Sequence, residues 1–153
     1  MLATVDDGRP VVVPLLYAYD EARQAVYMHT ALRGRARRTL EGNGGPASLT
    51  VFEMGRLLPA DEAAEFGLEY ASVVVSGTGA VVEDPREAEL GLRLLMEKYA
   101  PHLEAGRDYR PTSPEDLART AVLRLDIREW SGKEKAEGPD YPGAYRFRDV
   151  LGG

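Results

Sequence analysis

The sequence lacks cysteine altogether and contains only two histidines, His29 and His102, among its 153 residues. Without cysteine there can be no disulfide, thiolate nucleophile, iron–sulfur cluster or cysteine-ligated zinc. Two histidines are too few for a histidine-rich metal site, so we predict no bound metal.

Long hydrophobic runs are also absent. The longest, residues 11–18 and 71–75, fall far short of the roughly 20 residues that span a bilayer. Acidic residues already occur at Asp6 and Asp7, so the start of the chain does not resemble a signal peptide. We therefore expect a cytoplasmic protein with no membrane partner.

Length and composition indicate a single globular domain. At about 150 residues per domain the chain has room for one, and its 44% hydrophobic and 29% charged residues are ordinary for a soluble protein. The formal net charge of −6 argues against a nucleic-acid partner. This acidic average hides four arginines within six residues, at positions 33, 35, 37 and 38.

Hydrophobic patterning predicts a mainly β protein. Apolar runs bounded by turn residues predict strands over 1–5, 10–19, 25–30, 47–54, 69–82 and 121–130. Asp7-Gly8 predicts a hairpin turn, and Pro14 marks a bulge or an edge in the second strand. Residues 55–67 show no sustained period and are expected to form a long loop. Cap and stop signals predict helices over 30–40, 85–100 and 114–120.

The order of these elements indicates the fold class. Strands joined by turns, without regular alternation of strand and helix, favour an antiparallel sheet over a parallel one. We expect an antiparallel β-barrel with short helices packed over its ends.

The arginine cluster has two interpretations. If a helix begins near Thr30, Arg33 and Arg35 lie in or near its first turn, where the helix dipole disfavours cations. A bound anion would turn this repulsion into a binding site, and phosphate is the usual choice. The alternative is a solvated helix face whose arginines pair with neighbouring acids, which suits Arg37 and Arg38 better than Arg35.

Other polar residues carry weaker signals. His29 ends a predicted strand just before this helix, and is either a hydrogen-bonded structural residue or a donor to a bound ring or carboxylate. Ser72 lies on a hydrophobic strand without a nearby base or a nucleophile elbow, so a serine hydrolase is not expected. Glu62, Glu65 and Glu69 are interpreted as a solvated face without paired catalytic carboxylates.

Five motifs occur in a fixed order along the chain: Leu2-Ala3-Thr4-Val5-x-x-Gly8-x-Pro10, Val13-Pro14-Leu15, Val26-Tyr27-x-His29-x-Ala31-x-x-Gly34-Arg35, Tyr70-x-Ser72-Val73-x-x-x-Gly77 and Ser131-Gly132-Lys133. In this combination the sequence resembles the pyridoxamine 5′-phosphate oxidase-like flavin-binding split barrels, in the branch of the nitroimidazole-resistance proteins. We expect residues 1–135 to form the barrel and 136–153 an extended C-terminal tail.

The resemblance implies a split β-barrel homodimer that binds one FMN per subunit in clefts at the subunit interface. By the same resemblance, the Val13-Pro14-Leu15 segment would run along the isoalloxazine ring. Thr30 and Arg35 would hold the phosphate, with Arg37 as a second cation.

The remaining residues implied by the resemblance are His29, Ser72 and Lys133. His29 would flank the flavin on the substrate side as the catalytic residue, Ser72 would reach the flavin from the long strand, and Lys133 would close the site. The sequence departs from the family at Ala36, where related oxidases have a lysine, which would lower the affinity for phosphate. In relatives, a further helical segment usually precedes the first strand, whereas this sequence starts inside that strand.

Three function hypotheses follow. The first is an FMN-dependent oxidoreductase that passes electrons to a small electron-poor substrate. The second is a non-catalytic module that stores or senses FMN, or holds haem or a deazaflavin. The third is a degenerate barrel without a ligand, kept for its dimer contacts.

Overall fold

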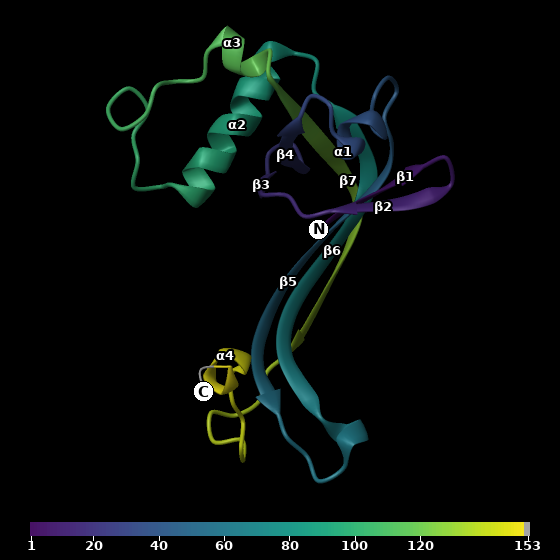
Figure 1. The fold of residues 1–153 in the computed structure, drawn as a ribbon, viewed down its shortest axis with the longest axis vertical. Helices are drawn as coiled ribbons and strands as arrows, with labels where there is room; N and C mark the ends of the chain where they lie inside the picture. The colour runs from purple at the N-terminus through teal and green to yellow at the C-terminus, as the bar shows by residue number, and fades with distance from the viewer. Residues whose placement is uncertain (152–153) are drawn as a thin grey trace. The chain divides into compact units, whose positions relative to one another are not determined.

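The computed structural model describes residues 1–151 (Figure 1). In this part of the chain the strands are β1 (Leu2–Asp6), β2 (Arg9–Val13), β3 (Tyr17–Asp20), β4 (Ala25–Ala31), β5 (Gly45–Leu58), β6 (Gly67–Val81) and β7 (Thr120–Lys135). The α-helices are α1 (Arg35–Arg38), α2 (Pro85–Tyr99), α3 (Pro114–Leu117) and α4 (Phe147–Val150).

The strands form one sheet in the order β2-β1-β5-β6-β7-β4-β3. The pairs β1–β2, β1–β5, β3–β4 and β4–β7 are antiparallel. Since β2 and β3 lie at opposite edges and do not pair, the sheet is not closed. The predicted fold class, a mainly antiparallel split β-barrel with short helices, is confirmed.

The β1–β2 hairpin forms at the predicted turn. Asp7 and Gly8 both have positive φ, 49° and 76°, as a two-residue hairpin turn with right-handed strand twist requires. Asp and Gly tolerate this backbone better than other residues. The hairpin buries one face, which includes Leu2, Thr4 and Val11.

The prediction of one strand over 10–19 is wrong. The chain leaves β2 after Val13 and enters β3 at Tyr17, so the two halves of the predicted strand lie at opposite edges of the sheet. Pro14 has no N–H to donate to a ladder and falls where β2 ends. The prediction failed because the apolar residues around Pro14 continue through residues 14–16, which cross from one strand to the other.

Three other boundaries differ from the predictions. The predicted helix over 30–40 is only α1, because β4 continues through Ala31. The predicted loop over 55–67 is shorter, because β5 runs on to Leu58. The last strand was expected to end at residue 130 but continues to Lys135. Residues 131–135, at the end of β7, are exposed and mostly polar, which concealed this strand end, since a strand needs only backbone partners to persist.

The chain divides into two compact units. The first consists of Met1–Leu49 and Val75–Glu129, and the second of Thr50–Val74 with the chain from Trp130 onward. The core of the first unit includes Tyr27 and Met28 of β4, both fully buried.

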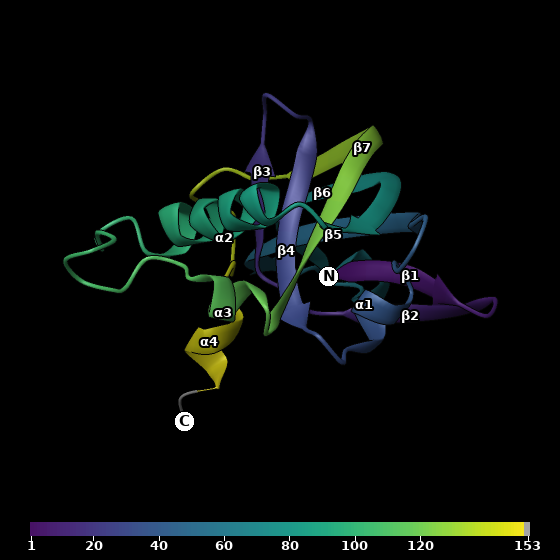
Figure 2. The same cartoon turned by 90° about the horizontal axis from the view of Figure 1, so that it is seen from above.

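Helix α2 packs on β3 and β4 of the first unit (Figure 2). It begins as predicted, with the Asp84 side chain accepting a hydrogen bond from the backbone N–H of Arg86 and with proline at the first position. Gly91 allows a close approach, because a Cβ there would lie 2.9 Å from Val122 Cγ1 and 3.0 Å from the Tyr27 ring. The helix is therefore seated tightly on β4 and β7.

In the second unit, the residues after β7 are attached to β5. Leu57 and Tyr145 form an antiparallel bridge, and the Tyr141 hydroxyl donates a hydrogen bond to the Pro59 carbonyl. Residues 136–151 thus contain a strand bridge and the short helix α4. The division into a barrel over 1–135 and a tail over 136–153 stays a prediction.

Candidate functional site

The site predicted from the sequence centres on the end of β4. His29 and Thr30 pair with Val122 and Ala121 of β7, directly after the fully buried Met28. His29 is exposed and Thr30 is half-buried. The strand therefore carries its last residues out of the core toward solvent, where they are accessible to a ligand.

A tight connection joins Thr30 to helix α1. Gly34 precedes the helix in an extended conformation, and a Cβ at this position would lie 3.1 Å from Thr30 Oγ1 and 3.2 Å from the Ala31 carbonyl oxygen. Arg35 is the first residue of α1. Thr30 and Arg35 are thus brought close together although they belong to different elements.

The arginines of the cluster differ in their partners. Arg38 pairs with Asp6 at 2.6 Å, and this hydrogen bond raises the pKa of the arginine. Arg37 pairs with Glu41. Within residues 1–151 the side chains of Arg33 and Arg35 form no hydrogen bond or ion pair, and Arg37 Nε is buried without a hydrogen-bond partner. Neighbouring acids therefore account for Arg38 and partly for Arg37, but not for Arg35.

Helix α1 also contacts β2, the strand that leads into the Val13-Pro14-Leu15 segment. Val13 pairs with Leu2 of β1 and is half-buried, whereas Pro14 is exposed. Because α1 contacts both β2 and β4, one short helix links the two stretches that the sequence singled out.

The two remaining predicted residues, Ser72 and Lys133, belong to the second unit. Ser72 lies on β6 beside Gly132 of β7, since a Cβ on Gly132 would be 3.8 Å from the Ser72 carbonyl oxygen. Lys133 follows on β7 and is exposed. Their contribution to the site stays a prediction.

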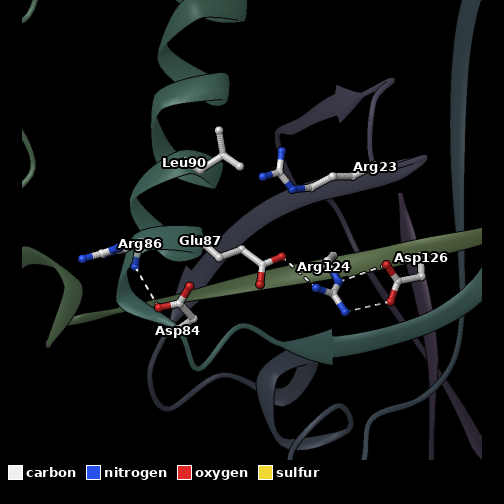
Figure 3. A pocket seen from close by; sticks show the side chains of 7 residues that line it. All are labelled: Arg23, Asp84, Arg86, Glu87, Leu90, Arg124 and Asp126. Atoms are coloured by element: carbon white, nitrogen blue, oxygen red, sulfur yellow. Dashed lines mark hydrogen bonds and ion pairs between the residues drawn. The ribbon is translucent and has the colours of Figure 1, made fainter.

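A partly buried polar network in the first unit was not predicted from the sequence; Figure 3 shows three of its members, Glu87, Arg124 and Asp126. The hydroxyl of Tyr27 donates to Glu87 Oε1 at 2.7 Å, and Arg124 Nη1 donates to the same oxygen at 2.7 Å. Arg124 Nη2 also donates to Asp126 at 3.0 Å. The network joins α2 to β4 and β7. Tyr27 and its partner Glu87 are 60 residues apart in the sequence, so no local motif predicts the network.

Burial and hydrogen bonding shift the pKa values in this network. Burial, followed by the hydrogen bond to Glu87, raises the pKa of Tyr27 well above its usual range. Burial opposes ionisation of Glu87, but hydrogen bonds from Arg124 and Tyr27 outweigh it and lower the pKa of Glu87. Both groups therefore keep one charge state at neutral pH, with tyrosine neutral and glutamate ionised.

A cavity of about 580 Å³ opens beside the network. It is lined by Arg23, Asp84, Arg86, Glu87, Leu90, Arg124 and Asp126 (Figure 3). Three arginines face three carboxylates in this lining, so it carries no net charge that would attract an ion. The cavity lies where helix α2 packs against the sheet.

A second correction concerns Glu69, which was expected on a solvated face. Its side chain is only 13% exposed and accepts hydrogen bonds from Arg56 at 2.6 and 2.8 Å. These hydrogen bonds, with one from the backbone N–H of Glu137, lower the pKa of Glu69 to about 2. Glu62 and Glu65 are exposed, as expected.

Within residues 1–151, no three His, Asp or Glu side chains come together as a metal site. Over the same residues, no helix is long and apolar enough to span a membrane.

A model of the family described as pyridoxamine 5′-phosphate oxidase matches residues 1–134, most of the chain. The chain belongs to the pyridoxamine 5′-phosphate oxidase family. No curated protein matches it.

Solved structures similar to this family member include a flavocytochrome and a FAD and haem binding protein. The flavocytochrome Anf3 from Azotobacter vinelandii is 25% identical, with a TM-score of 0.75; the match covers 98% of this chain and 65% of that one. The FAD and haem binding protein from Mycobacterium smegmatis is 27% identical, with a TM-score of 0.75 over 99% of this chain and 71% of that one. This chain thus spans just under two thirds of the length of Anf3.

A putative 5-nitroimidazole antibiotic resistance protein from Bacteroides thetaiotaomicron shares the fold. Its TM-score is 0.66, over 86% of this chain and 73% of that one. At 18% identity this likeness shows the fold alone.

Proposed function

We propose that the protein binds a flavin, FMN, and uses it to transfer electrons to a small electron-poor substrate. Family membership supports the flavin, because similar solved structures are described as a flavocytochrome and as a FAD and haem binding protein. A bound flavin supplies the electron-transfer chemistry, and the protein supplies binding, orientation and electrostatics.

The observation that carries the proposal is the group of donors around α1 that no protein group within residues 1–151 engages, among them the exposed guanidinium of Arg35. Arg35 has no partner among residues 1–151, Arg37 has a buried unpartnered Nε, and Thr30 lies beside the backbone that leads into the helix. A phosphate accepts hydrogen bonds from guanidinium and hydroxyl groups with charge assistance. In the proposal, Thr30 and Arg35 hold the phosphate and Arg37 is a second cation.

The remaining roles follow from the elements that carry each residue. The Val13-Pro14-Leu15 segment lines the isoalloxazine ring, because it leaves β2 beside the helix that holds the phosphate. His29 is exposed at the end of β4, next to Thr30, and contacts the substrate. For Ser72 and Lys133, which belong to the second unit, a role in flavin binding rests on the family resemblance alone.

The proposal includes a homodimer. The outward face of the β1–β2 hairpin is apolar, with Val5 48% and Val12 55% exposed. It borders a concave surface of about 470 Å³ whose lining includes Ala3, Pro10 and Ala47. An apolar hollow of this kind is typical of an interaction surface, and the partner we propose is a second copy of the chain.

The first experiment is an absorbance spectrum of the purified protein, followed by FMN titration of two variants. Arg35→Ala is expected to weaken FMN binding by about 1.5–3 kcal/mol, the usual value of a charged hydrogen bond. Arg38→Ala is the matched control, because Arg38 carries the same charge in the same helix but is paired with Asp6. A colourless protein that takes up no added flavin would contradict the proposal, and equal effects of the two substitutions would remove Arg35 from the site.

A second candidate is the binding of FAD and haem in place of FMN. One similar structure, at 27% identity, is described as a FAD and haem binding protein, and another, at 25%, as a flavocytochrome. Acid release of the cofactor followed by chromatography distinguishes FMN from FAD. A strong absorbance band near 400 nm after purification, about where haem absorbs, would favour the second candidate.

His29→Ala tests whether the bound flavin is catalytic. If His29 acts on the substrate, this variant keeps its FMN affinity but loses most of its turnover with an electron-poor acceptor. His102→Ala is the control, since His102 is an exposed histidine in the turn after α2. Unchanged turnover in His29→Ala would favour a protein that stores or senses flavin.

A further inference from the structure

Residues 14–16 join β2 to β3 and belong to no strand. The two strands lie at opposite edges of the sheet, so the position of this crossing segment depends on what holds its two ends. At the β2 end, Val13 is held by pairing with Leu2. The inference below rests on the proposed function, in which Val13-Pro14-Leu15 lines the flavin ring.

The other end of the segment is held in two ways: Tyr17 pairs with Met28 of β4 in the sheet, and the last turn of α2 contacts Tyr17 from outside the sheet. The backbone N–H of Tyr17, the first residue of β3, donates a hydrogen bond to the Tyr99 hydroxyl at 3.3 Å. Lys98 Nζ lies 3.2 Å from the centroid of the Tyr17 ring and 5.1 Å from that of Tyr99. A cation at this distance over an aromatic face is an attractive contact. Two neighbouring side chains of α2 thus hold the backbone and the ring of the same residue.

Helix α2 can keep Tyr17 in place because the helix is itself fixed to the sheet. Glu87, in its first turn, accepts hydrogen bonds from Tyr27 of β4 and Arg124 of β7. Gly91, one turn further on, packs against the same tyrosine ring. We call the contacts of Lys98 and Tyr99 with Tyr17 the clamp. It adds to the direct pairing of β3 with β4, the strand that carries His29 and Thr30, and fixes the Tyr17 ring and backbone N–H from the helix side.

From this geometry we infer that Lys98 and Tyr99 are positioning residues of the flavin site. They hold Tyr17, and through it the crossing segment, at a fixed place relative to the phosphate-binding end of β4. Within residues 1–151 the hydrogen-bond and cation–π contacts of their side chains are with Tyr17 and with each other, not with the arginines of α1. Loosening the clamp alters how the segment lies against the ring while leaving the phosphate contacts in place.

The test compares Lys98→Met and Tyr99→Phe with the wild-type protein. Lys98→Arg is the conservative variant, since a guanidinium keeps the attraction to an aromatic ring. Arg93→Met is the matched control, because it removes one positive charge from an exposed position of the same helix. FMN affinity is measured by quenching of FMN fluorescence. The visible spectrum and the reduction potential are measured at saturating FMN, where a change in affinity alone has no effect.

Lys98→Met and Tyr99→Phe are expected to weaken FMN binding roughly tenfold, about 1.4 kcal/mol, and to shift the spectrum and the potential of the bound flavin. Lys98→Arg and Arg93→Met should resemble the wild type. If Lys98→Met does not fold, Tyr99→Phe is compared with the wild type and with Lys98→Arg instead.

Provided that the wild type binds flavin, two outcomes overturn the inference alone. One is an unchanged spectrum and potential of the bound flavin in both Lys98→Met and Tyr99→Phe. The other is an equally large change in Arg93→Met. A wild-type protein that binds no flavin overturns the proposed function as well. The wild-type result therefore separates the two failures.

Discussion

Tyr27 shows at the scale of one residue how the first unit is held together. Its ring is fully buried in β4, and its hydroxyl reaches Glu87 on α2. A buried hydroxyl without a partner costs about 1–3 kcal/mol, so the position of α2 and the identity of this residue depend on each other. Nothing in the strand sequence distinguishes this tyrosine from one that only fills space.

Tyr27→Phe is expected to lower the free energy of unfolding by about 0.5–1.5 kcal/mol, because it removes one buried hydrogen bond and keeps the ring. Tyr19→Phe is the control, since Tyr19 is 47% exposed and its hydroxyl only accepts a bond from Gln24. Urea denaturation measures both variants. Equal effects in the two would show that the bond to Glu87 contributes nothing specific.

The arginine cluster shows what residue types reveal and what they do not. The sequence indicated that Arg37 and Arg38 suit pairing with acids better than Arg35, and their partners are Glu41 and Asp6. Asp6 is 32 residues away from Arg38, so its identity could not be predicted from local spacing. Only the fold shows that, within residues 1–151, the side chain of Arg35 forms no hydrogen bond or ion pair.

At the scale of the element, the end of β5 was hard to predict, since the strand runs on to Leu58 where a loop was expected. Gly55 and the acidic residues that follow are typical of a loop, but the chain continues as a strand because Arg56 and Glu69 pair across the two strands. Arg56 also donates to the carbonyl oxygens of residues 137, 138 and 139. One arginine therefore joins three stretches of the second unit.

The Glu69 carboxylate predicts a specific dependence of stability on pH. Its folded pKa of about 2 lies below the ordinary value of 4.5, so its contribution is complete above about pH 4.5 and is lost as the pH falls toward 2. Glu69→Gln should unfold at a lower temperature than wild type at pH 7, and the difference should shrink as the pH falls. Thermal unfolding followed by circular dichroism measures it.

Glu62→Gln is the control for that experiment, since it makes the same chemical change at an exposed position. Its unfolding temperature should follow the wild type at every pH. A gap between Glu69→Gln and wild type that stays constant down to pH 2 would refute the assignment to this carboxylate.

At the scale of the whole molecule, the outer face of the β1–β2 hairpin is an apolar surface that stays exposed within residues 1–151, with Val5 48% and Val12 55% exposed. Ala3, Val5, Pro10 and Val12 share this face because directly paired residues of a hairpin point to the same side. The opposite face supplies the core. A strand that is apolar on both faces predicts cover on both, which the proposed second copy provides.

Val5→Glu is therefore expected to shift the protein from dimer to monomer, because it places a charge in the apolar face. Light scattering after size-exclusion chromatography measures the mass in solution. Leu103→Glu, at an exposed residue outside the hairpin, should leave the mass unchanged. A wild-type protein that runs as a monomer at micromolar concentration would exclude the proposed dimer.

The sequence by itself determined the local features: the Asp7-Gly8 turn, the start of α2, the mainly β class and the motifs of the pyridoxamine 5′-phosphate oxidase family. These depend on neighbouring residues, whose backbone preferences and spacing are visible in the chain. Only the tertiary structure decided that β2 and β3 lie at opposite edges, that Glu69 is paired, and that Tyr27, Glu87 and Arg124 form a network. Such contacts join residues far apart in sequence, and their energies exist only after the fold has brought the groups together.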